Sequence, residues 1–483
     1  MPPFRPIHTS FAAAPGQAAR GRAVPGRARP GVLPVPPAAP VAPAAEAQSA
    51  TSWAPRNVWR SMTAGVEWTL IYVGFLAYMF AIITYRLPIA QPAMILCTIA
   101  LFLQKEQIRV SRVFVLMGLF LAWCAIGYTQ AAARYETNIV NRMTDLLKLW
   151  LIVLVAANAV RTRAQVRFLM IFCLACFALY PTRGAYFTFF LYHATVAGRA
   201  VWNYVYANPN DLAAQTLLWM CVCAGLLVTE KKGPVRTLSL LGVLMLTLLV
   251  FMTQSRGGIL AMVPVALGAL SFSKNQRLRT LVMVSAAAAV LALFAPKAVW
   301  DRLRGLQKAT DTEHLDQVDS SAEQRFEIWK VAVAIIKQNP VFGVGVGAYS
   351  TAHGLMAVRG DFNMIAEGQR DTHSTYLNVT AETGYVGVVL FLTIFGATLA
   401  HAEGVRRRIR NTQPATSKQI IFLELGLVGF FAAGVFGSFA QLNLTYIYPT
   451  ILWTLVEAVK REGTRPSLVR PAFRRLVPVR PGA

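Results

Sequence analysis

Three short motifs in this apolar chain carry side chains that could bind an anion or accept a proton. The first is SRGG at 255–258, which places Arg256 at the start of a predicted helix. A cation at that position opposes the helix dipole, while the two glycines leave backbone N–H groups open. Because a bound anion such as a phosphate group would resolve this conflict, the motif predicts an anion site.

The second motif is a predicted helix over 323–338, with charged residues on one side and apolar residues on the other. Arg325 projects from the middle of the apolar side. A guanidinium group in that position needs an acid or a bound anion as its partner. We therefore expect Arg325 to point toward the membrane domain. The apolar side consists of Phe326, Trp329, Ala332, Val333 and Ile336.

His373 opens the third motif, HSTYLN at 373–378. A neutral imidazole can take a proton from a hydroxyl group near neutral pH, so His373 is the candidate general base. Near it, or near other predicted outer helix ends, lie four candidates for substrate contacts. These are Arg183, Asn210, Tyr376 and Glu382. Asn210 also suits the cap of the helix that starts beside it.

Apolar helices must position these motifs, because 55% of the 483 residues are hydrophobic and only 14% are charged. Soluble proteins carry roughly a quarter of charged residues. Twelve segments approach the roughly 20 residues that a helix needs to cross a membrane. They cover residues 66–84, 87–103, 112–128, 144–160, 167–182, 211–229, 236–254, 257–272, 280–295, 383–400, 419–438 and 443–459. The sequence therefore predicts about twelve transmembrane helices.

Lys and Arg cluster in every second connection between these segments, which is the positive-inside pattern. The clusters are 105–112, 161–167, 231–236, 274–279, 406–418 and the tail after 460. The pattern predicts that both termini are cytoplasmic and that all three motifs lie on the outer side. Topology and contact with anionic membrane lipids also explain the net charge of +25, so no nucleic acid is expected as a partner.

The predicted fold is an all-α integral membrane protein with five parts. Residues 1–65 form a disordered, Ala/Pro/Arg-rich cytoplasmic tail, and residues 460–483 form a basic cytoplasmic tail. Transmembrane helices 1–9 occupy residues 66–295, and helices 10–12 occupy residues 383–459. Between the ninth and tenth spans, residues 296–382 form a mostly helical outer loop domain that carries two of the three motifs.

The order and sidedness of the motifs resemble the O-antigen ligase/polymerase family, whose members are integral-membrane glycosyltransferases of bacterial envelopes. After SRGG at 255–258, the long outer loop carries QRFEIW at 324–329, NPVFGVGVGAYS at 339–350 and HSTYLNVTAETGYVG at 373–387. The resemblance covers roughly residues 200–400. It implies a dozen or so helices in the bacterial inner membrane, with a periplasmic loop domain over the site.

The resemblance also implies an activity and its residues. Family members move a glycan from undecaprenyl pyrophosphate to lipid A–core, to a polysaccharide or to a protein hydroxyl, and they need no metal or other cofactor. The membrane-edge arginine of the family matches Arg256, its loop-helix arginine matches Arg325 and its periplasmic histidine matches His373. Many relatives have Asn after that histidine, where this chain has Ser374.

Several functions stay open at this point. Within the family, the sequence does not choose between a ligase, a polysaccharide polymerase and a protein O-oligosaccharyltransferase. A polytopic solute or anion transporter is an alternative of a different class, although such a protein should carry ionisable or broken-helix features near the bilayer centre. A non-enzymatic scaffold for envelope assembly is a third, and it would tolerate joint replacement of Arg256, Arg325 and His373.

Overall fold

The computed structural model describes residues 54–272, 320–360 and 362–464, and these ranges are helical without a β-sheet. Up to residue 272 the helices are α2 (Pro55–Thr63), α3 (Leu70–Thr84), α4 (Ala90–Leu103), α5 (Arg112–Ala159), α6 (Arg163–Phe177), η1 (Ala178–Thr182), α7 (Arg183–Phe190), η2 (Tyr204–Ala207), α8 (Pro209–Thr229), α9 (Pro234–Met252) and α10 (Arg256–Phe272). From residue 320 they are α13 (Ser320–Gln338), α14 (Tyr349–Arg359), η5 (Met364–Ala366), α15 (Thr375–Ile409), α16 (Pro414–Ala433) and α17 (Asn443–Thr464).

Every predicted apolar segment within these ranges coincides with a helix, and the predicted ninth span at 280–295 lies outside the described residues. Six helical segments are long and apolar enough to cross a membrane: 112–131, 163–190, 209–229, 234–252, 375–409 and 414–433. Three shorter apolar helices, at 70–84, 90–103 and 256–270, accompany them. The chain is thus a multi-pass membrane protein, while the count of twelve spans stays a prediction.

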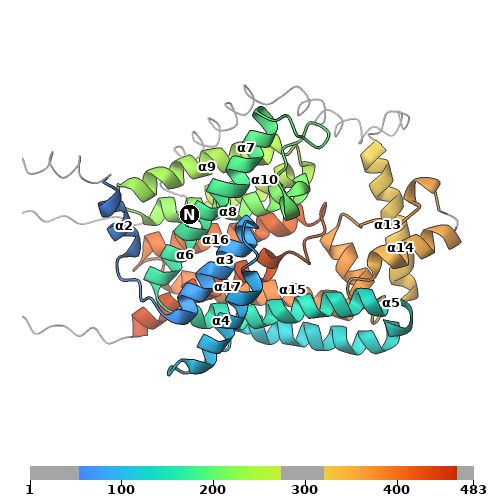
Figure 1. Cartoon of the computed structure of the whole chain (residues 1–483), viewed down its shortest axis with the longest axis horizontal. Coiled ribbons are helices and arrows are strands. Elements are labelled where there is room, and N and C mark those ends of the chain that lie inside the picture. Colours follow the sequence, from blue (N-terminus) through green and yellow to red (C-terminus); the bar gives the residue numbers. More distant parts are fainter. Residues whose placement is uncertain (1–53, 273–319, 361, 465–483) are drawn as a thin grey trace, which may run out of the picture. The chain divides into compact units, whose positions relative to one another are not determined.

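Helix α5 consists of two limbs that fold back on each other at Tyr135, where the backbone leaves the helical conformation. The indole N–H of Trp150 donates to the carbonyl of Phe114 at 2.8 Å, and the two rings stack with centroids 4.4 Å apart. Figure 1 shows the limbs side by side. They correspond to the predicted segments 112–128 and 144–160, so a hairpin stands where two spans were expected.

Helix α8 lies at the centre of the membrane helices. It packs against α9, α10 and α16, and 78% of its apolar window is buried, more than in any other of the six crossing segments. Membrane helices associate through small residues that let the backbones approach closely. Accordingly, a Cβ on Gly258 of α10 would lie only 2.7 Å from the Cβ of Ala213 in α8.

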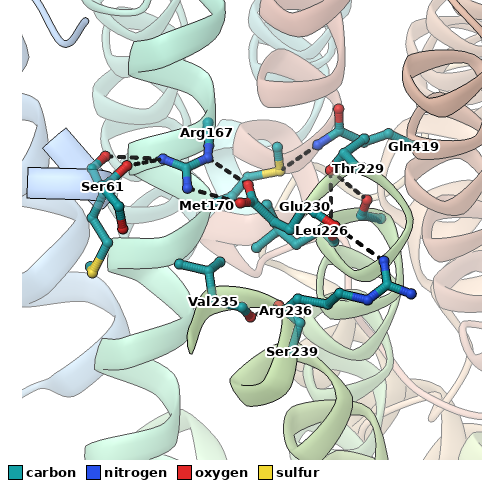
Figure 2. Close-up of polar contacts among 12 residues, drawn as sticks. Ser61, Arg167, Met170, Leu226, Thr229, Glu230, Val235, Arg236, Ser239 and Gln419 are labelled. Atoms are coloured by element: carbon teal, nitrogen blue, oxygen red, sulfur yellow. Dashed lines mark hydrogen bonds and ion pairs between the residues drawn. The ribbon is translucent and has the colours of Figure 1, made fainter. Parts of the chain in front are cut away.

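The basic connections meet at the end of α8 that lies opposite Asn210. As Figure 2 shows, the Arg167 guanidinium donates two hydrogen bonds to the Glu230 carboxylate, at 2.5 and 2.9 Å. It donates a further hydrogen bond to the Ser61 carbonyl at 2.9 Å. Arg163 also reaches Thr416 across the next connection, at 2.6 Å. Because α8 has 21 residues, this end lies about 30 Å from its start. This cluster of arginine side chains at one end of the membrane helices fits the positive-inside pattern. The compartment that this end faces stays a prediction.

The predicted disordered tail at 1–65 is wrong for residues 55–63, which form α2. Helix α2 packs on α6: the rings of Trp59 and Phe168 meet edge to face at 6.2 Å, and Arg167 donates to the carbonyl of Ser61. These tertiary contacts order a segment whose composition alone indicated disorder. Residues 1–53 lie outside the described part of the chain.

The Arg167→Ala variant is expected to lose about 1–3 kcal/mol of stability, because it leaves the largely buried Glu230 carboxylate without its partner. Heating the protein in detergent, and following the loss of monodisperse material, measures the effect. Arg407→Ala is the control, because Arg407 also pairs with a glutamate but its side chain is 72% exposed. Its midpoint should stay close to that of the wild type. Equal midpoints for all three proteins would contradict the expectation.

Candidate functional site

The SRGG motif starts α10 and is tied to the start of α8. The Ser255 hydroxyl accepts the backbone N–H of Gly258 at 3.2 Å and donates to the Asn210 side-chain oxygen at 2.9 Å. Arg199 donates to the same oxygen at 2.9 Å. Asn210 therefore joins the long loop before α8 to the first residues of α10. Arg256 lies at the N-terminus of α10, as predicted.

Two details of this region differ from the prediction. The cap of α8 is Asn208, which accepts the N–H of Asn210 at 2.9 Å, because Pro209 occupies the first helical position. The two glycines do not form an open set of N–H groups, since Ser255 occupies that of Gly258. A Cβ on Gly257 would lie 2.9 Å from the Cβ of Phe436, so the glycines permit close packing.

His373 sits on a loop with strained backbone, held by a chain of polar contacts. Its φ of 50° is in the left-handed region, which non-glycine residues seldom adopt. Its Nδ1 lies 3.4 Å from a carboxylate oxygen of Asp371, whose other oxygen accepts the Ser438 hydroxyl at 2.8 Å. The hydroxyl groups of Thr372 and Ser438 are hydrogen-bonded to each other at 3.0 Å. The side chain of His373 is 34% exposed, so a substrate can reach it.

Helix α13 brings Arg325 to this loop. The indole N–H of Trp329 donates to the carbonyl of Thr372 at 2.8 Å, and Arg325, one turn earlier, interacts electrostatically with His373. Arg325 lies on the side of the helix that is buried. That side consists of Ile328, Val331, Ala332, Ile335 and Ile336.

The predicted apolar side of α13 is wrong at two positions. Phe326 is 59% exposed and Val333 is 40% exposed, because the helix turns the Ile328–Ile335 stripe toward its neighbours α14 and α15 instead. The buried side of α13 is thus rotated by about one residue from the predicted side, and Arg325 lies on both.

Burial lowers the pKa of His373 below its ordinary value of 6.5, and the charge of Arg325 lowers it further, while Asp371 raises it. Burial is the largest of the three effects. The imidazole is therefore neutral at pH 7, which is the form that can accept a proton.

The loop at 434–442, between α16 and α17, holds the other parts of the site together. The N–H of Thr375 donates to the carbonyl of Gly434 at 2.8 Å, and its hydroxyl donates to that of Gly437 at 2.7 Å. The same loop carries Ser438 against Asp371 and Phe436 against Gly257. The SRGG helix and the His373 loop thus rest on one short connection, and the carboxylates of Asp211 in α8 and Asp371 also interact electrostatically.

Glu382 and Tyr376 lie on α15, which begins at Thr375 and kinks at Gly384. Glu382 is 4% exposed and accepts the N–H of Tyr349 at 3.4 Å, inside the glycine-rich turn that follows α13. The hydroxyl of Tyr376 donates to the carbonyl of Phe431 at 2.8 Å. Both side chains thus make contacts within the protein, and their contact with a substrate stays a prediction.

Arg183 is a predicted site residue whose contact in the described part of the chain lies within its own helix, so its role at the site stays a prediction. Its guanidinium stacks on the ring of Phe187 within α7, at 4.7 Å, and no hydrogen bond or ion pair in the described ranges ties it to the cluster. Arg199 lies there instead, bonded to Asn210 and to the carbonyl of Thr253 at 2.8 Å. Nothing but its place in a long outer loop marked Arg199 in the sequence.

A metal site is not evident in this part of the chain, since the described residues contain no group of three His, Cys, Asp or Glu side chains placed to hold one. The residues that could hold an anionic group are the arginines at the start of α10 and on the buried side of α13. Together with the neutral imidazole, they could stabilise a leaving anion and remove a proton from a hydroxyl group.

Comparison with known families matches residues 241–392 to the model described as O-antigen ligase. The matched stretch contains Arg256, Arg325, His373 and Glu382. A search among curated proteins finds no match. Residues 241–392 of this chain are thus similar to the O-antigen ligase family.

Proposed function

We propose that this protein is a multi-pass glycosyltransferase that moves a glycan from a polyprenyl diphosphate to an acceptor hydroxyl group in the bacterial envelope. The observation that carries the proposal is the family match at 241–392, which includes Arg256, Arg325 and His373. The electrostatic coupling of Arg325 to His373 and the contact of His373 with Asp371 support it. We assign the donor as undecaprenyl pyrophosphate glycan and the membrane as the inner membrane, with the site on the periplasmic side.

In this proposal, Arg256 and Arg325 bind the diphosphate. Cleavage of the bond between the sugar C1 and the diphosphate oxygen leaves negative charge on the departing group. Fixed guanidinium groups stabilise such charge strongly where water is scarce, and they bind phosphate oxygens in pairs. The polyprenyl chain stays in the bilayer, which accounts for a site at the membrane edge.

His373 removes the proton of the acceptor hydroxyl. The Asp371 carboxylate lies 3.4 Å from Nδ1 of His373, so it favours a proton on that nitrogen and leaves Nε2 to take the proton of the acceptor. The acceptor oxygen then attacks C1 from the face opposite the diphosphate, a new glycosidic bond forms as the old bond breaks, and the anomeric centre inverts. The proton on His373 returns to water or to the leaving phosphate oxygen.

A deletion strain tests the function and names the acceptor. Lipopolysaccharide, secreted polysaccharide and glycoproteins from the deletion and complemented strains are run on gels. Loss of long-chain lipopolysaccharide identifies a ligase, shortening of a polysaccharide identifies a polymerase, and loss of glycan from protein identifies a protein glycosyltransferase. If all three are unchanged while uptake of a solute is lost, the chain is a transporter and the proposal fails.

The Asp371→Asn variant is expected to move the acid limb of the pH–rate profile to lower pH. A base acts only above its pKa, so activity falls as pH drops through the pKa of His373, which lies below 6.5. Asp371 raises that pKa, so its removal lowers it. The plateau rate should also fall, by about 10-fold or more, because the imidazole loses the group that orients it. Glu106→Gln, an exposed acid near Arg161, is the control. An unmoved limb would contradict the role of Asp371.

A further inference from the structure

A cavity of about 320 Å³ borders the loop 434–442 at Gln441. It lies among α3, α4, the second limb of α5 and the residues that lead into α17. Gln441 of the loop accepts a hydrogen bond from Arg142 of α5 in the lining. The SRGG helix contacts the same loop at Phe436. Different residues of this one loop therefore border the cavity and the proposed diphosphate site.

The lining has an apolar part and a charged part. Tyr78, Ile82, Met94, Leu146 and Leu149 supply apolar wall. Arg142 and Lys148 supply two cations, and the side-chain amides of Gln91, Gln441 and Asn443 supply further hydrogen-bonding groups. A ligand that matches both parts carries a phosphate on an amphipathic body.

The two cations of the cavity, Arg142 and Lys148, do not follow the positive-inside pattern of the chain. The start of α4, the residues before α17 and the Arg142 end of the second α5 limb are all helix ends that the positive-inside pattern places outside. Orientation disfavours Lys and Arg in such connections, although Arg86 and Arg134 also lie in them. Topology therefore does not account for Arg142 and Lys148. Within the protein, Arg142 contacts Gln441 and interacts electrostatically with Glu382, and Lys148 pairs with Asp145.

The surface of α4 next to the cavity suits contact with the bilayer. Ile95, Ile99 and Phe102 are 56%, 52% and 71% exposed, a pattern that lipid chains cover in a membrane helix. Lys148 pairs with Asp145 at 3.3 Å, and these side chains are 41% and 56% exposed. An exposed pair of this kind is weak, so a phosphate group can displace the carboxylate.

We propose that this cavity binds the phosphate-bearing headgroup of a lipid acceptor. The assignment rests on the proposed function, in which the acceptor approaches His373 from the face opposite the diphosphate. The loop connects the two places, because Gln441 contacts Arg142 while Ser438, three residues earlier, contacts Asp371 beside His373. A lipid anchored at the cavity lies at the membrane edge with its sugar hydroxyl groups free to reach the imidazole.

The test measures retention of monophosphoryl lipid A by the purified protein in phosphatidylcholine nanodiscs, with mass spectrometry as the readout. Lys148→Glu is expected to lower retention about 10-fold, because it replaces a charge-assisted contact by repulsion. Ala90→Trp, which fills the cavity without a change of charge, should lower retention similarly. Asp145→Asn should raise it about threefold, since it frees Lys148. Lys460→Glu, at an i,i+3 pair of α17, is the matched control and should retain the probe.

Retention does not depend on transfer, so this result and the proposed function can fail separately. Equal retention by all variants would overturn the site. Equal retention of the dephosphorylated probe by the wild type would overturn the recognition of phosphate. If excess phosphatidylglycerol displaces the probe completely, the cavity holds any anionic lipid and the acceptor assignment is overturned. Monodisperse elution of each variant confirms that a loss of retention is not a loss of fold.

Discussion

Replacing His373 with alanine should reduce glycan transfer by about 10²–10⁴-fold while the protein still inserts and accumulates. The expectation follows from the position of the imidazole, which is partly exposed, neutral at pH 7 and held by Asp371. Transfer is measured with purified protein in liposomes, from the release of polyprenyl diphosphate and the appearance of the glycosylated acceptor.

His193→Ala is the matched control for that experiment. His193 is also a loop histidine with a φ of 50°, and it is exposed, but its contacts in the structure are to its own loop. The loss of a strained histidine is therefore the same in both variants, and only the His373 variant loses the proposed base. Full transfer by His373→Ala would refute the role of the imidazole.

Arg256→Ala should lower the rate of transfer by about 10²–10³-fold, the effect of removing one group that stabilises developing charge. The reason is its position at the start of α10, beside the Ser255–Asn210–Arg199 contacts and over the loop that carries the His373 segment. Arg256→Lys should recover part of the rate, because an ammonium group keeps the charge but not the paired hydrogen bonds. The loss should appear mainly in kcat, since the charge develops in the transition state.

Arg112→Ala controls for the local effect of the Arg256 substitution. Arg112 also begins a helix directly after a capping serine, because Ser111 accepts the N–H of Phe114 at 3.0 Å. Both substitutions remove a cation that opposes a helix dipole, but Arg112 lies at the other end of the membrane helices. If both variants lose activity equally, the loss at Arg256 reflects helix stability. If neither loses activity, Arg256 has no part in transfer.

Local patterns were sufficient to predict the helical fold and the elements that carry the three motifs. Hydropathy located the helices within the described ranges, and helical periodicity placed Arg325 on the buried side of α13. Both depend on residues that are close in the sequence. The hairpin within α5 and the six crossing segments agree with this expectation. Helix α2 shows the limit, because its order comes from packing on α6 rather than from its own composition.

The contacts that assemble the site could not be predicted in this way. The sequence predicts residues 434–438 as the end of the span at 419–438, whereas in the structure loop 434–442 joins the SRGG helix to the His373 loop through residues far apart in the sequence. Asp371 had a signal, since an acid two residues before the histidine can orient it. Arg199 had none, because its role depends on Asn210 and Thr253, which only the tertiary fold brings near.

The most direct test of this account is a cryo-electron microscopy structure of the protein in nanodiscs with an undecaprenyl diphosphate glycan bound. The account predicts the diphosphate between the guanidinium groups of Arg256 and Arg325, and the sugar C1 on the side of His373 Nε2. It would be contradicted by a diphosphate bound elsewhere, or by one that contacts neither arginine while His373 faces away from the sugar.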